Sequence, residues 1–252
     1  MAFALSACEP ANVRKTMPEQ EPANGRTEVF VMGMLHASHK TSKRYSLEVI
    51  RETVNAVHPD IILTELPATT YRQALAGFAE TGRVTEKRAR AFPEYIDAII
   101  PMTSTHDFAI IGTAGWTPAI AAHRNEVLAS IARDPARGSQ WLAWQRSQAA
   151  FREAVAGHQD DPQFIHSTAY DDAVRQLYLP YMRYFDRDLG PGGWDAVNRS
   201  HWANIAGELD QLKGQKKRVL ITYGAYHKHR ILDALAQRDD VIVRDIRPCF
   251  PD

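Results

Sequence analysis

Two copies of the motif Gly-x-x-His stand almost at opposite ends of the chain, and each directly follows an apolar run. The first, VFVMGMLH, ends at His36, and the second, VLITYGAYH, ends at His227. A third apolar run, IILTELP, contains Glu65 near its end. Two neutral imidazoles and a carboxylate form a common ligand set for a divalent metal that activates water. Without a metal, one histidine can act as general base while Glu65 orients it, so either arrangement predicts hydrolysis.

Short aliphatic runs predict the strands that position these residues. The runs are Val29–Met34, Asp60–Thr64, Phe108–Gly112, Arg218–Tyr223 and Val241–Asp245. They do not alternate apolar with polar residues, which is typical of strands covered on both faces. The segment Ser46–Val57, between the first two runs, has its apolar residues at helical spacing. The resulting strand–helix–strand unit implies a parallel sheet.

The ends of these strands are the expected place of the site. All strands of a parallel sheet end at one edge, and ligands of open α/β sheets bind there. We therefore expect His36, Glu65 and His227 to face one cleft at that edge. Glycine at Gly33 and Gly224 permits a positive φ, lets the chain turn out of the strand and leaves room for a ligand.

The whole sequence predicts an α/β fold, with a mainly parallel sheet flanked by helices and a helical insertion at about 117–193, between the third and fourth strands. Thr117 followed by proline is typical of a helix cap and first turn. A further amphipathic helix is predicted over Asp195–Lys213. Residues 27–252 would then form a single domain, as expected for a chain of 252 residues that is 44% apolar.

The first 26 residues predict a tail or a lipoprotein tether. LSAC, at Leu5–Cys8, resembles a bacterial lipid-attachment signal, and the Pro-rich stretch after it would be flexible. A signal peptide needs an apolar segment of about 7–15 residues before the cysteine, so the natural start would lie further upstream. The alternative is a chance cysteine in the tail of a cytoplasmic protein. Because no apolar stretch reaches ~20 residues, Cys8 is the only membrane anchor that the sequence suggests.

Charge and cysteine content argue against a nucleic-acid-binding protein and against a protein built on disulfides or cysteine-bound metal. Thirty basic and thirty acidic residues cancel, and the longest basic cluster is the short Lys213–Arg218 segment. A nucleic acid is therefore not expected as a partner. The two cysteines, Cys8 and Cys249, cannot form a disulfide framework or a cysteine-based metal cage.

The paired motifs, the strand that ends in glutamate and an arginine-containing helix before the second motif resemble the TraB/TIKI superfamily. This superfamily includes GumN-like proteins and is related to erythromycin esterases and ChaN-like haem-binding lipoproteins. The resemblance covers roughly residues 28–245 and implies a hydrolase-like site with His36, Glu65 and His227 at the family positions. The family's Arg-Asn helix motif appears here as RSHWA, with Arg199 retained and Ser200 in place of the asparagine.

The predicted function is a hydrolase that acts on a peptide, ester or amide bond, with Mn, Fe, Co or Zn held by His36, Glu65 and His227. Arg199 would bind a substrate carboxylate or stabilise an oxyanion. The partner would be a small-molecule or peptide substrate. The alternatives are a ChaN-like lipoprotein that binds haem or iron without catalysis, and a degenerate member that keeps only the fold.

Four residues beside the motifs are candidate substrate-binding residues: Tyr223, Tyr226, His201 and His39. The tyrosines can equally be packing aromatics, and His39, which could be an extra ligand, is expected to be a solvated loop residue. At ~100° per residue, Arg199 lies about 120° from the centre of the apolar stripe of its helix, whereas His201 points along it.

Overall fold

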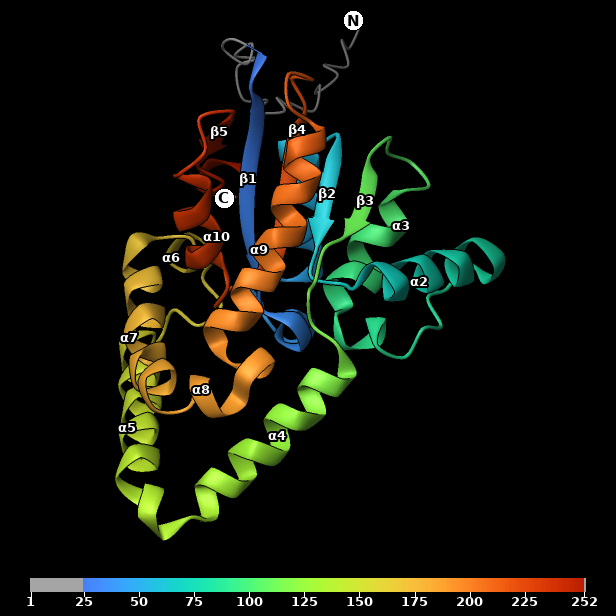
Figure 1. Cartoon of the computed structure of the whole chain (residues 1–252). Coiled ribbons are helices and arrows are strands. Elements are labelled where there is room, and N and C mark those ends of the chain that lie inside the picture. The colour runs from blue at the N-terminus through green and yellow to red at the C-terminus, as the bar shows by residue number, and fades with distance from the viewer. Residues whose placement is uncertain (1–24, 252) are drawn as a thin grey trace, which may run out of the picture.

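The computed structural model describes residues 25–251 and contains a five-stranded, all-parallel sheet in the order β3-β2-β4-β1-β5 (Figure 1). The strands are β1 (Thr27–Met34), β2 (Ile61–Thr64), β3 (Ala109–Gly112), β4 (Arg218–Gly224) and β5 (Val241–Arg244). Helices flank the sheet, so the predicted α/β fold with a parallel sheet is confirmed. Cys8 and the tether predicted after it lie outside the described residues.

The helical segments lie between the strands and after the last one. They are η2 (His36–Lys40), α1 (Leu47–Val57), α2 (Ala68–Thr81), η3 (Ala89–Ala91), η4 (Glu94–Ile99), α3 (Ile100–Met102), α4 (Pro118–Arg133), η5 (Pro135–Arg137), α5 (Gly138–Ala154), α6 (Pro162–Ile165), α7 (Thr168–Tyr184), α8 (Asp186–Leu189), η6 (Gly190–Gly192), α9 (Trp194–Gln211), α10 (Lys228–Leu235) and η7 (Arg247–Cys249).

Both faces of the sheet are covered, which explains the continuous apolar runs of the strands. Successive strand residues point to opposite faces and enter two separate hydrophobic clusters. One cluster contains Met32, Ile62 and Leu220, and the other contains Val31, Leu63 and Ile221. Helices α9 and α10 cover the second cluster through residues such as Ile205 and Ile231. The first cluster extends into α1, η4 and the helical insertion.

The helical insertion lies at the carboxyl edge of the sheet. Helices α4 and α5 project beyond this edge as a long hairpin, and α7 runs beside α5 (Figure 1). Helix α4 begins as predicted, because the Thr117 side chain accepts the N–H of Ile120 and proline occupies the first turn. Between residues 117 and 193, all regular elements of the structure are helical. The predicted insertion between the third and fourth strands is therefore confirmed.

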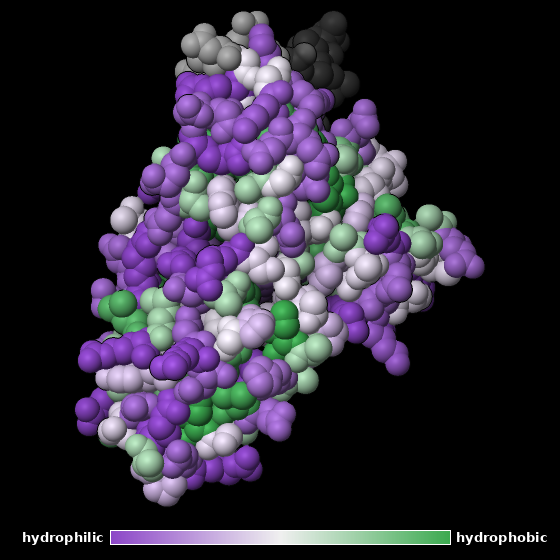
Figure 2. All heavy atoms as spheres, viewed as in Figure 1, coloured by the Kyte–Doolittle hydropathy of each residue, from purple (hydrophilic) through white to green (hydrophobic). Residues whose placement is uncertain are grey.

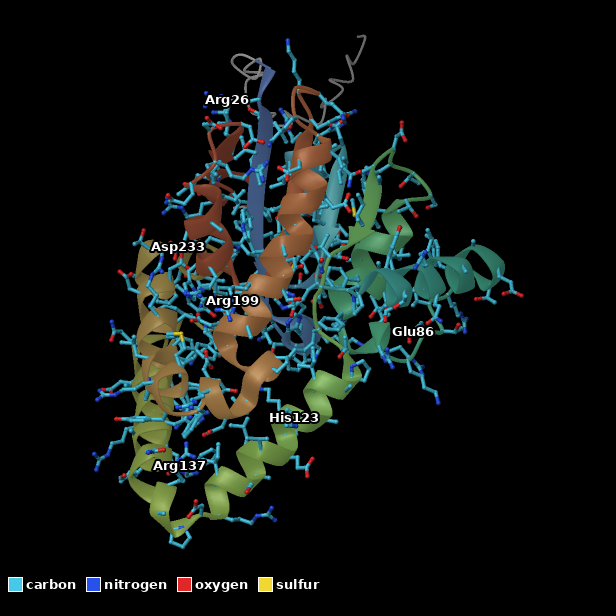
Figure 3. All side chains as sticks on the ribbon, in the orientation of Figure 1. Arg26, Glu86, His123, Arg137, Arg199 and Asp233 are labelled. Carbon is cyan, nitrogen blue, oxygen red and sulfur yellow. The ribbon has the colours of Figure 1, made fainter. Side chains whose placement is uncertain are left out.

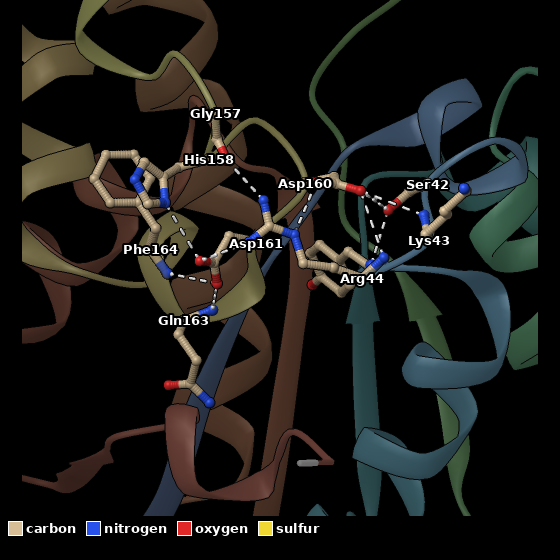
Figure 4. Close-up of polar contacts among 10 residues, drawn as sticks. Ser42, Lys43, Arg44, Gly157, His158, Asp160, Asp161, Gln163 and Phe164 are labelled. Carbon is tan, nitrogen blue, oxygen red and sulfur yellow. Dashed lines mark hydrogen bonds and ion pairs between the residues drawn. The ribbon is translucent and has the colours of Figure 1, made fainter.

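A polar cluster ties the segment after β1 to this insertion (Figure 4). Asp160 lies in the turn before α6 and accepts hydrogen bonds from the Ser42 hydroxyl at 3.0 Å and the Lys43 N–H at 3.3 Å. Arg44 donates to Asp160 at 3.3 Å and to the Gly157 carbonyl at 2.7 Å. The loop that carries the first motif is thus held against the helices that cover the carboxyl edge.

The surface of the molecule carries both hydrophilic and hydrophobic side chains. Figure 2 shows a largely hydrophilic face with apolar side chains gathered in its lower part, over the helical insertion. Large hydrophobic residues among the exposed ones of the described chain are Leu142, Leu179, Tyr226 and Val243. None of the described helices combines the length and apolar character needed to cross a bilayer.

Candidate functional site

The carboxylate of Glu65 lies between the two motif histidines. Its Oε2 is 3.6 Å from His36 Nε2, and its Oε1 is 3.8 Å from His227 Nε2. The backbone N–H of Gly224 donates to Oε2 at 2.6 Å. These residues follow β1, β2 and β4, which are neighbours in the sheet. The structure therefore brings the three predicted residues together at the carboxyl edge, and we call them the His–Glu–His cluster.

Neighbouring atoms approach the two motif glycines so closely that a side chain at either position would collide with them. A Cβ at Gly224 would lie 2.7 Å from His36 Nε2 and 3.3 Å from Glu65 Oε2, so a side chain there would displace the site. A Cβ at Gly33 would lie 3.0 Å from the Cα of Ala225. The positive φ falls on His36 itself, at 52°, and on neither motif glycine. The space beside Gly224 is filled by the site's own side chains.

His36 is held by a buried carboxylate. Its Nδ1–H donates to Glu94 Oε1 at 2.6 Å, which leaves the Nε2 lone pair on the side of Glu65. Glu94 is fully buried in η4, a π-helical segment, and its Oε2 has no hydrogen-bond partner among the described residues. Burial lowers the pKa of His36, but the Glu94 hydrogen bond and the Glu65 and Glu94 charges outweigh it and raise that pKa above its ordinary value.

His227 is held by an amide instead. Asn198 on α9 donates its Nδ2–H to the Trp194 carbonyl at 2.7 Å, so its Oδ1 accepts the His227 Nδ1–H at 2.9 Å. The His227 Nε2 lone pair then lies on the side of Glu65. Burial and nearby groups, His201 among them, hold the pKa of His227 well below its ordinary value. This imidazole therefore stays neutral.

The two histidines with the same motif thus have opposite chemical character. His36 has an anionic partner and a raised pKa, whereas His227 has a neutral partner and a lowered pKa. Burial also raises the pKa of Glu65, against the opposing effect of the His36 charge. Groups whose surroundings separate their pKa values in this way are suited to different acid–base roles.

The donor types of the cluster suit a divalent metal, and the spacing does so for each pair that Glu65 forms with a histidine. Two ligands of one tetrahedral ion, with bonds of about 2.1 Å, lie about 3.4 Å apart, close to the 3.6 and 3.8 Å that join Glu65 to the histidines. Glu65, His201 and His227 also have donor atoms within 4.8 Å of one another, a group that does not include His36. However, His201 Nδ1 accepts the Gly115 N–H at 3.0 Å, so its proton is on Nε2. His36 and His227 are therefore the imidazoles with a free lone pair.

Arg199 lies away from the cluster. Its side chain is 70% exposed on the outer face of α9 and approaches Asp195 at 3.9 Å (Figure 3). His201, two residues later, is buried on the inner face, and burial lowers its pKa to about 4. The helical spacing had indicated this difference in direction. The role expected for Arg199 at the substrate is therefore not supported by its position.

The remaining candidates divide between packing and exposure. The Tyr223 hydroxyl is hydrogen-bonded to Thr113 at 2.8 Å within the core. Tyr226 is 39% exposed, with its ring centroid 5.4 Å from that of Phe151. His39 is buried. Its Nε2 accepts the Leu35 N–H at 2.8 Å, and its Nδ1 donates to the Tyr45 carbonyl at 2.7 Å. With both nitrogens satisfied, His39 is a structural residue of the loop and neither a solvated residue nor an extra ligand.

Sequence reasoning missed two residues that hold the histidines of the cluster: Glu94 and Asn198. Glu94 had a weak signal, since it is an acidic residue within the apolar stretch FPEYIDAII. Asn198 directly precedes the arginine that the family resemblance selected.

Comparison of the chain with protein-family models, curated proteins and solved structures gives no match. The class that fold and site define is therefore a parallel α/β protein with a His–Glu–His cluster at the carboxyl edge of its sheet.

Proposed function

We propose that the protein is a hydrolase of the TraB/TIKI type that cleaves a peptide, ester or amide bond at the His–Glu–His cluster. The observation that carries this proposal is the position of the Glu65 carboxylate between two imidazole Nε2 lone pairs. Each lone pair is directed by a different hydrogen-bond partner at Nδ1. Such convergence of oriented bases and a carboxylate is typical of sites that activate water.

The residues of the chain have separate roles in this proposal. His36 takes a proton from the attacking water at Nε2, while the buried Glu94 carboxylate holds the ring and stabilises the imidazolium, as in other carboxylate-oriented histidine bases. His227 remains neutral and accepts a hydrogen bond at Nε2. Glu65, fixed by the Gly224 N–H, orients the water between the two rings.

A divalent transition metal such as Mn, Fe, Co or Zn matches the donor types of the same residues, although the donor atoms that lie within 4.8 Å of one another belong to Glu65, His227 and His201. Glu65 and the Nε2 atoms of His36 and His227 would hold it, and Glu94 and Asn198 would orient the imidazole ligands from behind. Bound there, it would supply Lewis acidity and a nucleophilic hydroxide at neutral pH.

The experiment is a screen of peptides, esters and amides with the purified chain, followed by the Glu65→Gln variant and metal analysis. If Glu65 acts on the water alone, turnover falls by about 10²–10⁴-fold and metal content is unchanged. If Glu65 is a ligand, metal content falls with turnover. His106→Ala is the matched control, because His106 is exposed before β3, at the opposite edge of the sheet. Wild-type turnover in Glu65→Gln would contradict the proposal.

A further inference from the structure

Arg124 is a half-buried guanidinium without an acidic partner. It lies on α4, with Cζ 5.4 Å from the centroid of the Trp116 ring and 5.7 Å from that of Tyr181. Within residues 25–251, no carboxylate forms an ion pair with it. Because burying a charge is costly, partly buried arginines are normally paired. Aromatic faces hold this guanidinium in place and leave its N–H donors free for a ligand.

Among the described residues, two buried donors also lack partners, one on the Tyr181 ring that faces Arg124 and one on Trp194, two residues after the Gly192 that packs on Arg124. The Tyr181 hydroxyl and the Trp194 indole Nε1 have no hydrogen-bond partner in the described part of the chain, although these residues are only 2% and 4% exposed. Burial raises the pKa of Tyr181, and both the charge of Arg124 and its side-chain contact with the hydroxyl oppose that rise, so the guanidinium lies beside this hydroxyl. Unsatisfied buried donors are rare, and here they accompany an unpaired cation.

These donors adjoin the His–Glu–His cluster. The Trp194 ring is stacked between His227, at a centroid distance of 4.6 Å, and Tyr178, at 3.6 Å. A Cβ at Gly192 would lie 3.0 Å from Arg124 Cβ, so the segment just before Trp194 packs directly on Arg124. The positive charge of Arg124 also contributes to the low pKa of His227. Packing contacts therefore connect the cluster, through Trp194 and the segment before it, to the unpaired arginine.

We propose that Arg124, together with the Tyr181 hydroxyl and the Trp194 indole N–H, binds a carboxylate of the substrate. The planar fork of arginine matches a carboxylate with two parallel hydrogen bonds, and the two neutral donors complete the set. This inference rests on the proposed hydrolase and names its substrate class: acylated amino acids or peptides with a free carboxylate near the bond that is cleaved. Arg124 takes the role that the sequence assigned to Arg199.

The test is equilibrium binding to the full chain, read by tryptophan fluorescence and calorimetry, with hippurate and its neutral analogue hippuramide as probes. We expect saturable binding of hippurate and at least tenfold weaker binding of hippuramide. Arg124→Met should lower the affinity for hippurate at least tenfold and leave the affinity for hippuramide unchanged, as expected for loss of a charge-assisted contact. Arg133→Met is the control, because Arg133 is exposed on the same helix, and it should bind both probes like the wild type.

Three results would overturn the inference: equal affinity for both probes, unchanged hippurate binding in Arg124→Met, or no saturable binding below roughly 10 mM. Inorganic phosphate that competes as well as hippurate would instead indicate a general anion site and overturn the carboxylate assignment. If Arg124→Met fails to fold, Arg124→Lys is the second variant, because it keeps the charge and removes the planar guanidinium. It must still lower the affinity for hippurate. The carboxylate assignment is read from the difference in affinity between the two probes, whereas a failure of the proposed hydrolysis is read separately, from the turnover of the cluster variants.

Discussion

At the scale of single residues, one repeated motif yields two different histidines. His36 and His227 follow the same Gly-x-x pattern, but a buried carboxylate holds the first and an amide holds the second. The difference arises from Glu94 and Asn198, which lie far from the motifs in sequence. The type of base at each position is therefore decided by the neighbouring elements and not by the motif.

In the proposed hydrolase Glu94 positions His36, and its substitution by glutamine tests this role. Glu94→Gln should lower kcat by about 10–100-fold, the usual effect of losing a hydrogen-bond partner behind a catalytic histidine, with little change in KM. Kinetics on a substrate found by screening would measure it. Asp97→Asn, an exposed change in the same π-helical segment, should retain wild-type kcat. Equal kcat in Glu94→Gln and wild type would mean that the buried carboxylate does not support His36.

Gly224 can be tested by adding a single methyl group. Gly224→Ala would place its Cβ 2.7 Å from His36 Nε2, and the shift this requires should cost about 1–3 kcal/mol of unfolding free energy and most of the turnover. Gly207→Ala is the matched control, since a Cβ there meets nothing within 4 Å on helix α9. Urea unfolding should show the control equal to or more stable than the wild type. An active, fully stable Gly224→Ala would refute the close approach described here.

At the scale of elements, the strands and the helix before the second motif were predictable because their patterns are local. Buried parallel strands require continuous apolar runs, and the capping of α4 at Thr117 requires only neighbouring residues. The segment that carries Glu94 has no comparable pattern. The ring contacts of Arg124 are made with Trp116, in the loop before α4, and with Tyr181 on α7, and no pattern around Arg124 predicts them. Sequence patterns therefore indicated the edge where the site lies, but not the residues that surround it.

Helix α9 provides a direct comparison between neighbouring positions. Asn198 faces His227, whereas the side chain of Arg199 is 70% exposed. Asn198→Ala should lower turnover about 10–100-fold, because the Nδ1–H of His227 loses its acceptor and the ring its orientation. Arg199→Ala should remain within about twofold of wild type, as is usual for an exposed residue with a single weak ion pair. A large loss in Arg199→Ala alone would restore the role implied by the family resemblance.

At the scale of the whole molecule, His166 links the helical insertion to the sheet. It lies between α6 and α7, accepts the Gly33 N–H at Nε2 over 2.8 Å, and donates Nδ1–H to the Pro162 carbonyl at 2.7 Å. Burial, with a contribution from the Lys228 charge, lowers the pKa of His166 to about 3. The folded protein therefore keeps this imidazole neutral in conditions where the unfolded chain binds a proton.

The sign of the resulting pH dependence follows from linkage. Because the folded pKa of His166 lies below its ordinary 6.5, its stabilising contribution is complete above pH 6.5 and is lost as the pH falls toward 3. The corresponding slope in unfolding free energy is at most about 1.4 kcal/mol per pH unit. His166→Gln keeps an acceptor for Gly33 but cannot titrate. Urea unfolding between pH 7 and 4 should therefore show a shallower slope in the variant, and identical slopes would contradict this assignment.

The central proposal is that the His–Glu–His cluster carries out hydrolysis. The most direct measurement is kcat/KM of the double variant His36→Ala/His227→Ala on a substrate found by screening, beside His106→Ala. We predict a loss of at least about 10³-fold in the double variant, since both bases are removed, and wild-type kcat/KM in the control. Full activity in the double variant would show that the repeated Gly-x-x-His only shapes the edge of the sheet and that the chemistry lies elsewhere.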